Sequence, residues 1–249
     1  MTEEPARSSE VTRERILALL SGGELEVQGL LPWSSNYTFL VLVSDGALSI
    51  PAVYKPCAGE RPLWDFASAS LCRREVAAYV LSEQLGWPAV PPVVLRDGPH
   101  GPGSVQLFVN ADHETHYFSL RESGQFDECL ESIALFDIVA NNADRKGGHC
   151  LLGTDGQVWA IDHGLTFHSE YKVRTIIWDY SGRRIPDDRL AELRAVSDRL
   201  QRGHPLFESL AQLLSIQEIH ALRARLTRLV RAGTFPHPRP GRNVPYPLV

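Results

Sequence analysis

The spacing of apolar residues changes once along this chain, close to residue 110. Before that point, short apolar runs bounded by turn residues predict β-strands at residues 37–43, 49–54, 92–95 and 104–109. One helix is predicted among these strands, at residues 67–85, because apolar residues recur there at helical spacing and Gly86 follows as a stop signal. The first half of the chain is therefore expected to be rich in sheet.

After residue 110 the spacing is mainly helical. It predicts helices at residues 126–139, 187–200, 206–214 and 216–230. Two short apolar runs, at residues 150–152 and 158–161, flank a Thr-Asp-Gly turn and predict a β-hairpin. A sheet-rich N-lobe before a helical C-lobe predicts an α+β protein with a bilobal, protein-kinase-like fold.

The same patterns predict where the lobes begin and end. Residues 12–110 form the expected N-lobe and residues 111–232 the expected C-lobe, whereas residues 1–11 are expected to be a flexible N-terminus. The segment 233–249 is rich in proline and is expected to be an extended tail.

Composition excludes some classes of function. At 249 residues and 43% hydrophobic content, the chain can build one large domain or two lobes that share a cleft. A net charge of −5 gives no general electrostatic reason to bind nucleic acid, so no such partner is expected. No run of about 18 apolar residues occurs, which argues against integral membrane contact and favours a cytoplasmic protein.

The four cysteines do not suggest a disulfide framework or a zinc site. No C-x-x-C pair occurs among them, so all four are expected to be reduced and mostly buried thiols. They are Cys57, Cys72, Cys129 and Cys150.

Two isolated aspartates carry the clearest chemical signal. Asp144 lies in a polar, glycine-containing loop, and Asp162 lies 18 positions later, directly after an apolar run that predicts a strand. Phosphotransferases hold a catalytic aspartate and a metal-binding aspartate in this way on either side of ATP. Asp144 would accept the proton of the attacking hydroxyl, and Arg145 or Lys146 would neutralise charge on the transferred phosphoryl group. The alternative for Asp144 is a residue that caps a turn.

Asp162 is predicted to bind a metal. A carboxylate at the end of an apolar strand is costly unless it holds a cation or joins a hydrogen-bond network.

Upstream, Lys55 ends a predicted strand and Glu75 lies 20 positions later in the predicted helix. Kinases pair a strand lysine with a helix glutamate to orient the α and β phosphates of ATP. The alternative for this pair is two unrelated, solvated surface charges.

Four blocks in a fixed order carry a resemblance to a known family: residues 33–39, 52–56, 144–145 and 160–167. They resemble the phosphatidylinositol 3- and 4-kinase superfamily, most closely its type II phosphatidylinositol 4-kinase branch and the actinobacterial proteins grouped with it. In that branch a serine-rich loop replaces the glycine-rich loop, an x-Lys-Pro strand carries the ATP lysine, and Asp-Arg precedes an Ile-Asp-x-Gly-Leu metal motif. The resemblance spans residues 31–167 and is weak over the C-terminal helices.

The resemblance implies ATP and a divalent metal, Mg²⁺ or Mn²⁺, as cofactors. It implies that Lys55 contacts the phosphates and is held by Glu75, that Asp144 is catalytic and that Asp162 binds the metal. The loop residues expected to cover the phosphates are Ser34, Ser35 and Asn36. The hinge expected to receive adenine through its backbone comprises Gln106, Leu107, Phe108 and Val109.

One position departs from the family pattern. Members of this superfamily usually place an asparagine a few residues after the catalytic aspartate as the second metal ligand, and His149 stands in that register here. Histidine offers one neutral nitrogen in place of a hard oxygen, so it suits Mg²⁺ poorly and Mn²⁺ somewhat better. One metal then suffices, or the metal preference shifts, or catalysis is impaired.

Three functions are consistent with these patterns. The first is a kinase that transfers the γ-phosphate of ATP to a hydroxyl of a small molecule, an inositol-type compound or a protein. The second is a pseudokinase that binds nucleotide and regulates a partner, and His149 favours it. The third is an interaction domain that has lost nucleotide, which the retained set of two aspartates, a lysine and a glutamate argues against.

The last predicted helix is amphipathic and basic. Arginines surround an apolar stripe, and they are Arg223, Arg225, Arg228 and Arg231. This face is expected to be a solvated surface of the C-lobe, and docking on an anionic surface is the alternative.

Overall fold

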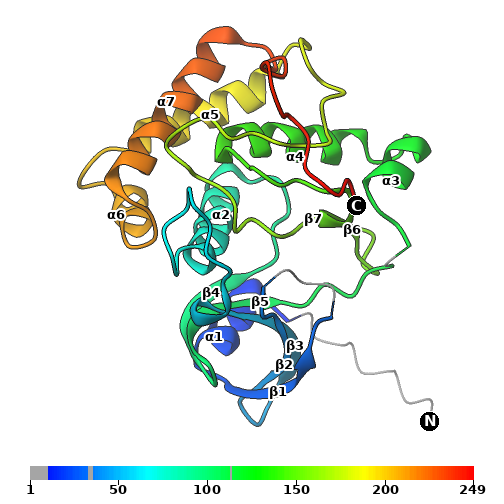
Figure 1. The fold of residues 1–249 in the computed structure, drawn as a ribbon, viewed down its shortest axis with the longest axis vertical. Coiled ribbons are helices and arrows are strands. Elements are labelled where there is room, and N and C mark those ends of the chain that lie inside the picture. The colour runs from blue at the N-terminus through cyan, green and yellow to red at the C-terminus, as the bar shows by residue number, and fades with distance from the viewer. Residues whose placement is uncertain (1–10, 33–35, 113) are drawn as a thin grey trace, which may run out of the picture.

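The computed structural model describes residues 11–32, 36–112 and 114–249. Figure 1 shows two lobes, one built on a curved sheet and the other on helices, with helix α2 (Leu71–Leu85) lying between the sheet and the C-lobe helices. The structure confirms the predicted α+β, bilobal, protein-kinase-like fold.

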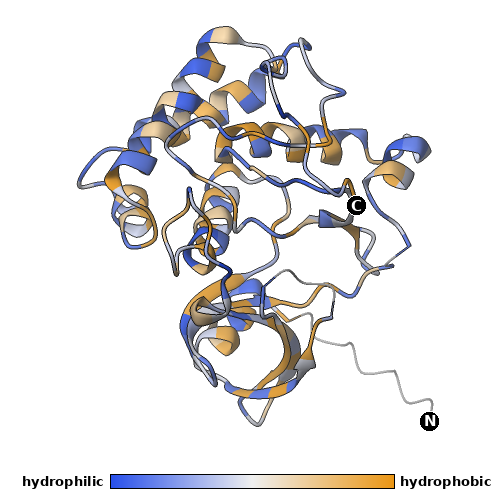
Figure 2. Ribbon diagram, viewed as in Figure 1, coloured by the Kyte–Doolittle hydropathy of each residue, from blue (hydrophilic) through white to orange (hydrophobic). Residues whose placement is uncertain are grey.

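The N-lobe is a five-stranded antiparallel sheet with helix α1 (Arg13–Gly22) packed on it. The strand order is β1-β2-β3-β5-β4, with bounds Glu24–Leu30, Phe39–Ser44, Ser49–Pro56, Gly101–Leu107 and Val93–Gly98. Leu19 and Leu20 of α1 pack with Val41 of β2 and Tyr54 of β3, all fully or almost fully buried. Figure 2 shows the hydrophobic residues that follow the curved sheet and this helix.

The C-lobe holds the larger core. Its elements are α3 (Tyr117–Ser123), α4 (Asp127–Ala140), β6 (Cys150–Leu152), β7 (Val158–Ala160), α5 (Asp187–Arg199), α6 (Pro205–Ala211) and α7 (Ile216–Ala232). Helix α4 runs through the centre, and all of its residues from Ser132 to Ala140 are buried. Ser215 caps α7 in a capping box with Glu218, which satisfies N–H groups at the start of the helix.

Two short 3₁₀ turns lie at places that matter for the site. Turn η1 (Cys57–Gly59) directly follows β3, and turn η2 (Gly147–His149) follows the loop that contains Asp144.

The predicted helix at residues 67–85 begins later than expected. Helix α2 starts at Leu71 because Ala69 has a φ of 58°, a left-handed conformation that no helix interior tolerates. The sequence patterns also missed α1, β1 and α3.

The tail after α7 has no helix or strand, yet it is bound to the C-lobe by backbone hydrogen bonds. Phe235 N–H donates to the Arg183 carbonyl at 2.9 Å, and the Asn243 carbonyl accepts from Thr175 N–H at 3.0 Å. Farther along, Gly147 N–H donates to the Leu248 carbonyl at 2.7 Å. The tail therefore reaches the loop that contains Asp144.

The structure contradicts the expectation that all four cysteines are free thiols. Cys57 and Cys72 form a disulfide with a Cα–Cα distance of 5.9 Å, which links η1 to the first turn of α2. The other two cysteines are free, Cys129 exposed and Cys150 buried. No described helix combines the length and apolar character that crossing a bilayer requires.

Candidate active site

A cavity of about 270 Å³ lies between the end of β3, the start of α2 and loops of the C-lobe. Titratable side chains from both lobes line it: Lys55, Glu60, Arg61, Glu75, Asp144, Lys146, His149 and Asp162. Residues predicted from two distant parts of the sequence thus meet in one cavity. Such a concentration of charge in a concave site is typical of a functional centre.

Lys55 bridges the two lobes. Its Nζ lies 2.5 Å from Glu75 Oε1 and 3.0 Å from Asp162 Oδ1. Burial opposes the charge on Lys55, but the two carboxylates outweigh it and raise its pKa above the ordinary value. The ammonium is therefore positively charged and fixed at the cavity, as phosphate binding requires.

Glu75 is the fixed point of this network. Its side chain is 4% exposed, and its second oxygen, Oε2, accepts a hydrogen bond from His163 N–H at 2.8 Å. Burial raises the pKa of Glu75, while Lys55 opposes that shift. One carboxylate thus joins β3, α2 and the segment that follows β7.

Helix α2 has a second link to the C-lobe through Arg74. Its guanidinium donates to the Thr166 carbonyl and to Glu218 Oε1 on α7, each at 2.5 Å, and the residue is 4% exposed. Buried, charge-assisted hydrogen bonds of this kind hold orientation as well as position. Helix α2 is therefore held with Glu75 facing Lys55.

Asp162 has an unusual backbone. It follows β7 with a φ of 59°, in the left-handed region that non-glycine residues rarely adopt and that aspartate tolerates better than most. The conformation directs the carboxylate into the cavity, where its side chain is 46% exposed. Lys55 is the main cause of a pKa for Asp162 far below the ordinary value. The group is therefore an anion at neutral pH and open to a cation.

Asp144 lies in the same cavity on the loop after α4. Its N–H donates to Asn142 Oδ1 at 3.0 Å, and its Oδ2 lies 3.1 Å from Lys146 Nζ. Burial raises the pKa of Asp144, although Lys146 opposes the shift. A carboxylate with a raised pKa is a better proton acceptor, which suits a general base.

Arg145 does not face the cavity, which corrects the expectation that it neutralises the transferred phosphoryl group. The side chain is fully buried and lies 3.0 Å from Asp137 Oδ1. It also donates to the carbonyls of His149 and Ile161, at 3.2 and 2.7 Å, and contacts His163 Nε2 at 2.8 Å. Arg145 therefore braces the two segments that carry the site, while its neighbour Lys146 reaches the cavity.

Asp137 is a site-supporting residue that the sequence patterns missed. It is fully buried on α4 and accepts from Asn142 Nδ2 and Thr175 Oγ1, in addition to Arg145. An acidic residue inside the otherwise apolar run from Ile133 to Ala140 was a usable signal, because a buried carboxylate needs a charged or hydrogen-bonding partner.

His149 lies next to the predicted metal ligand. Its Nε2 is 3.2 Å from Asp162 Oδ2, and its Nδ1 accepts from Lys146 N–H at 3.4 Å. Burial lowers the pKa of His149 to about 4, so the ring is neutral at pH 7. With Nδ1 accepting, the proton sits on Nε2 and points at Asp162. In this arrangement His149 orients the carboxylate, and it becomes a metal ligand only after the ring rotates or changes tautomer.

The loop that was predicted to cover the phosphates lies only partly within the described residues. Asn36 lines the cavity, and its Oδ1 accepts from Arg61 N–H at 2.9 Å. Ser34 and Ser35 lie outside the described residues. Thr38, which lies in the resemblance block 33–39, also lines the cavity, as do Glu60, Arg61 and Leu63, which had no recognisable signal in the sequence.

The predicted hinge does not line this cavity. Gln106 is buried in β5, and the N–H groups of Leu107 and Phe108 donate to the carbonyls of Pro92 and Pro51. Val109 is the hinge residue whose N–H has no partner within the described residues. Adenine recognition by the hinge stays a prediction, and Val109 is its best candidate donor.

The chain is similar in sequence to a mycobacterial protein over nearly its whole length. No protein-family model matches the chain. Protein Rv2133c of Mycobacterium tuberculosis is 39% identical, over 92% of this chain and 94% of that protein. Phosphatidylinositol 4-kinase gamma 4 of Oryza sativa subsp. japonica is 31% identical, but the match covers 43% of this chain and 22% of that protein.

Solved structures share the fold at low identity. A hydra Fam20 structure with sugar aligns with a TM-score of 0.62 and 16% identity, over 90% of this chain and 89% of that chain. The Helicobacter pylori proinflammatory kinase CtkA aligns with a TM-score of 0.51 and 11% identity, over 86% and 94%. These structural similarities show a kinase-like fold, whereas the sequence identity to the mycobacterial protein shows common ancestry. The chain belongs to the same protein family as Protein Rv2133c of Mycobacterium tuberculosis.

Proposed function

We propose that the protein is an ATP-dependent kinase that transfers the γ-phosphate to a hydroxyl group. The observation that carries this proposal is the position of Lys55 Nζ between Glu75 and Asp162, with Asp144 lining the same cavity. A fixed ammonium, a metal-binding carboxylate and a separate base are the parts that phosphoryl transfer needs, because catalysis there is mainly positioning and charge stabilisation.

Each side chain has a distinct task in the proposed reaction. Lys55 binds the α and β phosphates, and Glu75 keeps it from turning away. Asp144 orients the acceptor hydroxyl and takes its proton, and Lys146 offsets negative charge on the transferred group. Asp162, with His149 beside it, would hold Mg²⁺ or Mn²⁺, and the ion supplies charge neutralisation on the phosphate oxygens.

The donor set fits a divalent cation in part. Asp162 offers a partly exposed anionic oxygen that suits Mg²⁺ or Mn²⁺. His149 is neutral at pH 7, as a ligand must be, but its Nε2 proton now faces Asp162. The fit favours Asp162 as the principal protein ligand, with Mn²⁺ better suited than Mg²⁺ to any contribution from His149.

A second function rests on this same histidine. If His149 keeps its hydrogen bond to Asp162 when nucleotide is bound, the site holds ATP without a complete metal centre. The protein would then be a pseudokinase, a nucleotide-binding module with little turnover. Metal-dependent turnover separates the two functions.

The acceptor class is a further part of the proposal. The rice relative is named as a phosphatidylinositol 4-kinase, and the match to it supports the type II phosphatidylinositol 4-kinase-like branch and an inositol-type hydroxyl. Small-molecule and protein hydroxyls are the other candidates that a screen should include.

The test combines stability and turnover. Thermal unfolding should shift upward with ATP and Mn²⁺ or Mg²⁺, because a ligand that binds the folded state stabilises it. Asp144→Asn should retain that shift and lose at least about 100-fold in turnover, since a general base contributes roughly that much. Asp162→Asn should lose the metal-dependent part of the shift.

Asp188→Asn, an exposed change on α5, is the matched control and should behave as wild type. If millimolar nucleotide did not shift the unfolding temperature, both the kinase and the pseudokinase proposals would be wrong. Full turnover in Asp144→Asn would show that another group is the base.

A further inference from the structure

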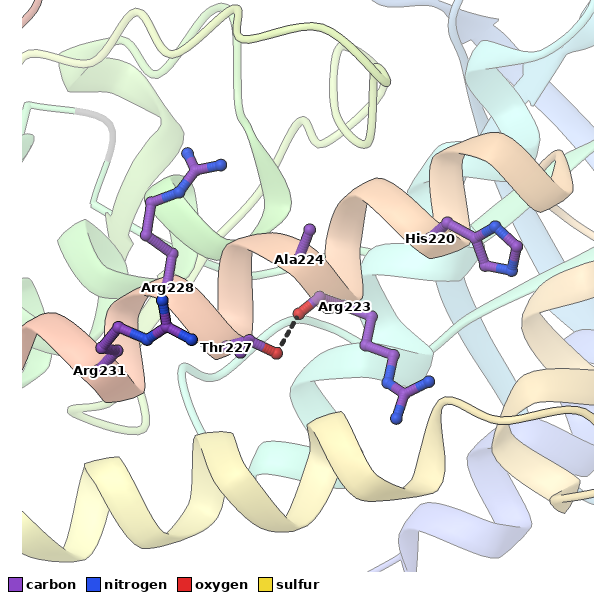
Figure 3. Close-up of a pocket in the computed structure, with 6 residues that line it drawn as sticks. All are labelled: His220, Arg223, Ala224, Thr227, Arg228 and Arg231. Atoms are coloured by element: carbon purple, nitrogen blue, oxygen red, sulfur yellow. Dashed lines mark hydrogen bonds between the residues drawn. The ribbon is translucent and has the colours of Figure 1, made fainter.

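Helix α7 carries more positive charge than the proposed chemistry uses. Arg223, Arg228 and Arg231 line an open groove of about 540 Å³ on its outer face (Figure 3). Figure 3 shows Arg223 and Arg228 extending to opposite sides of the helix. A smaller pocket of about 200 Å³ lies on the neighbouring face and shares Arg228 and Ala224 with the groove.

The small pocket brings together cationic side chains from two segments. Arg225 and Arg228 come from α7, and Arg239 comes from the tail. Arg239 is held over the ring of Tyr171, with its guanidinium carbon 3.8 Å from the ring centre. The exposed Ser169 adds a hydroxyl to the same lining. Three guanidinium groups and a hydroxyl thus surround one small space.

Arg225 is fixed but not neutralised. Its Nε donates to the Val139 carbonyl at 2.9 Å and its Nη1 to the His168 carbonyl at 3.3 Å, whereas its buried Nη2 has no partner within the described residues. Burial, and then the nearby Arg228, lower the pKa of Arg225 to about 10. Glu218 acts in the opposite direction, but it is paired with Arg74 and forms no ion pair with Arg225.

The neighbouring arginines are equally without acidic partners. Across the described part of the chain, no carboxylate lies within 4.0 Å of the guanidinium groups of Arg225, Arg228 or Arg239. Like charges held close together cost free energy unless an anion binds between them. An anion that binds in the pocket would therefore relieve the repulsion between these arginines.

We propose that this pocket is a binding site for a phosphate group, separate from the nucleotide cavity. Guanidinium groups pair with phosphate oxygens through two parallel hydrogen bonds, which favours phosphate over a spherical anion such as chloride. The ligand is inorganic phosphate or a small phosphomonoester, and the adjoining groove gives the remainder of a phosphomonoester room along α7.

Phosphate bound there would act on a segment next to the candidate active site. Asn141, three positions before Asp144, donates to the carbonyls of His168 and Glu170 at 2.7 and 2.6 Å. The same His168 carbonyl accepts from Arg225. Occupation of the pocket therefore stabilises the segment after the metal motif in its present position.

The test uses inorganic phosphate and a protein whose nucleotide cavity is disabled by Lys55→Met. Thermal stability is measured against sodium phosphate, with sodium chloride at equal ionic strength as reference. We expect a saturable, phosphate-specific rise. Arg228→Ser and Arg239→Ser, both at exposed positions, should raise the apparent Kd at least about tenfold, because each removes a charge-assisted pair.

Arg223→Ser is the matched control, since it removes the same charge from α7 outside the small pocket. It should change the apparent Kd by less than about twofold. If chloride raised the thermal stability as much as phosphate, or if Arg223→Ser weakened phosphate binding as much as Arg228→Ser, the effect would be general electrostatic attraction to a basic surface. Either result would overturn the proposal. No rise at all would overturn it as well.

The outcome is independent of the proposed kinase activity. In the protein with Lys55 intact, Arg228→Ser should leave the nucleotide-dependent shift unchanged, because Arg228 is not part of the nucleotide cavity. Inorganic phosphate and a phosphomonoester are distinguished by repeating the titration with glycerol phosphate. Tighter binding of the ester indicates that the groove is used.

Discussion

Replacing Arg145 by methionine should destabilise the fold rather than merely slow a reaction. The substitution keeps much of the side-chain volume but removes the cation from a fully buried network. Among the described residues, only Asn142 and Thr175 would still donate side-chain hydrogen bonds to Asp137, which would remain a buried charge without a counter-ion. Breaking a buried ion pair by removing one partner costs about 3–5 kcal/mol.

This loss of unfolding free energy can be converted into an expected decrease in Tm. For a chain of this length, 1 kcal/mol corresponds to roughly 2–4 °C in Tm, so Arg145→Met should lower Tm by about 6–20 °C. Calorimetry, or urea unfolding followed by circular dichroism, measures the change. Arg184→Met removes an exposed pair with Asp187 and should cost less than about 1 kcal/mol.

The double variant Arg145→Met with Asp137→Asn gives the decisive comparison. Asparagine removes the stranded charge, so the double variant should be more stable than the sum of the two single losses predicts. A loss below about 1 kcal/mol for Arg145→Met, or strict additivity in the double variant, would refute the view that this pair braces the site.

Two further predictions concern the cysteines and His149. Reducing the Cys57–Cys72 bond, which closes a 15-residue separation, should lower the free energy of unfolding by about 3 kcal/mol, as measured by urea unfolding with and without reductant. Cys57→Ser should then be insensitive to reductant, and equal sensitivity would contradict the assignment. Because burial lowers the pKa of His149 from 6.5 to about 4, its unfolded form binds a proton that its folded form does not. The free energy of unfolding should therefore fall as pH drops from about 6.5 to about 4, by up to about 3 kcal/mol from this group. Urea unfolding of His149→Asn over the same range should show a smaller fall, and an unchanged fall would assign the effect to other groups.

Much of the fold was readable in the sequence because its helices repeat an apolar face. Helices α4 and α5 begin and end within one residue of the predicted bounds. The patterns missed α1 and β1 because their residues are largely exposed or half-buried, so apolar spacing marks them weakly. Short, partly solvated elements depend on tertiary contacts more than on their own pattern.

The candidate site was predictable in part. Motif order indicated that Lys55, Glu75 and Asp162 belong together, and the structure brings them within hydrogen-bonding distance. Sequence could not show that Arg145 faces the core while Lys146 faces the cavity, because neighbouring loop residues share composition but not direction. The disulfide was equally hidden, since it depends on where η1 lies relative to α2.

The hydrogen bond between Gly147 N–H and the Leu248 carbonyl bears on how this protein should be produced for biochemical work. A purification tag fused after Val249 would begin beside the loop that contains Asp144, where it could displace the tail or cover the cavity mouth. Weak turnover in a C-terminally tagged sample would therefore not count against the proposed kinase activity.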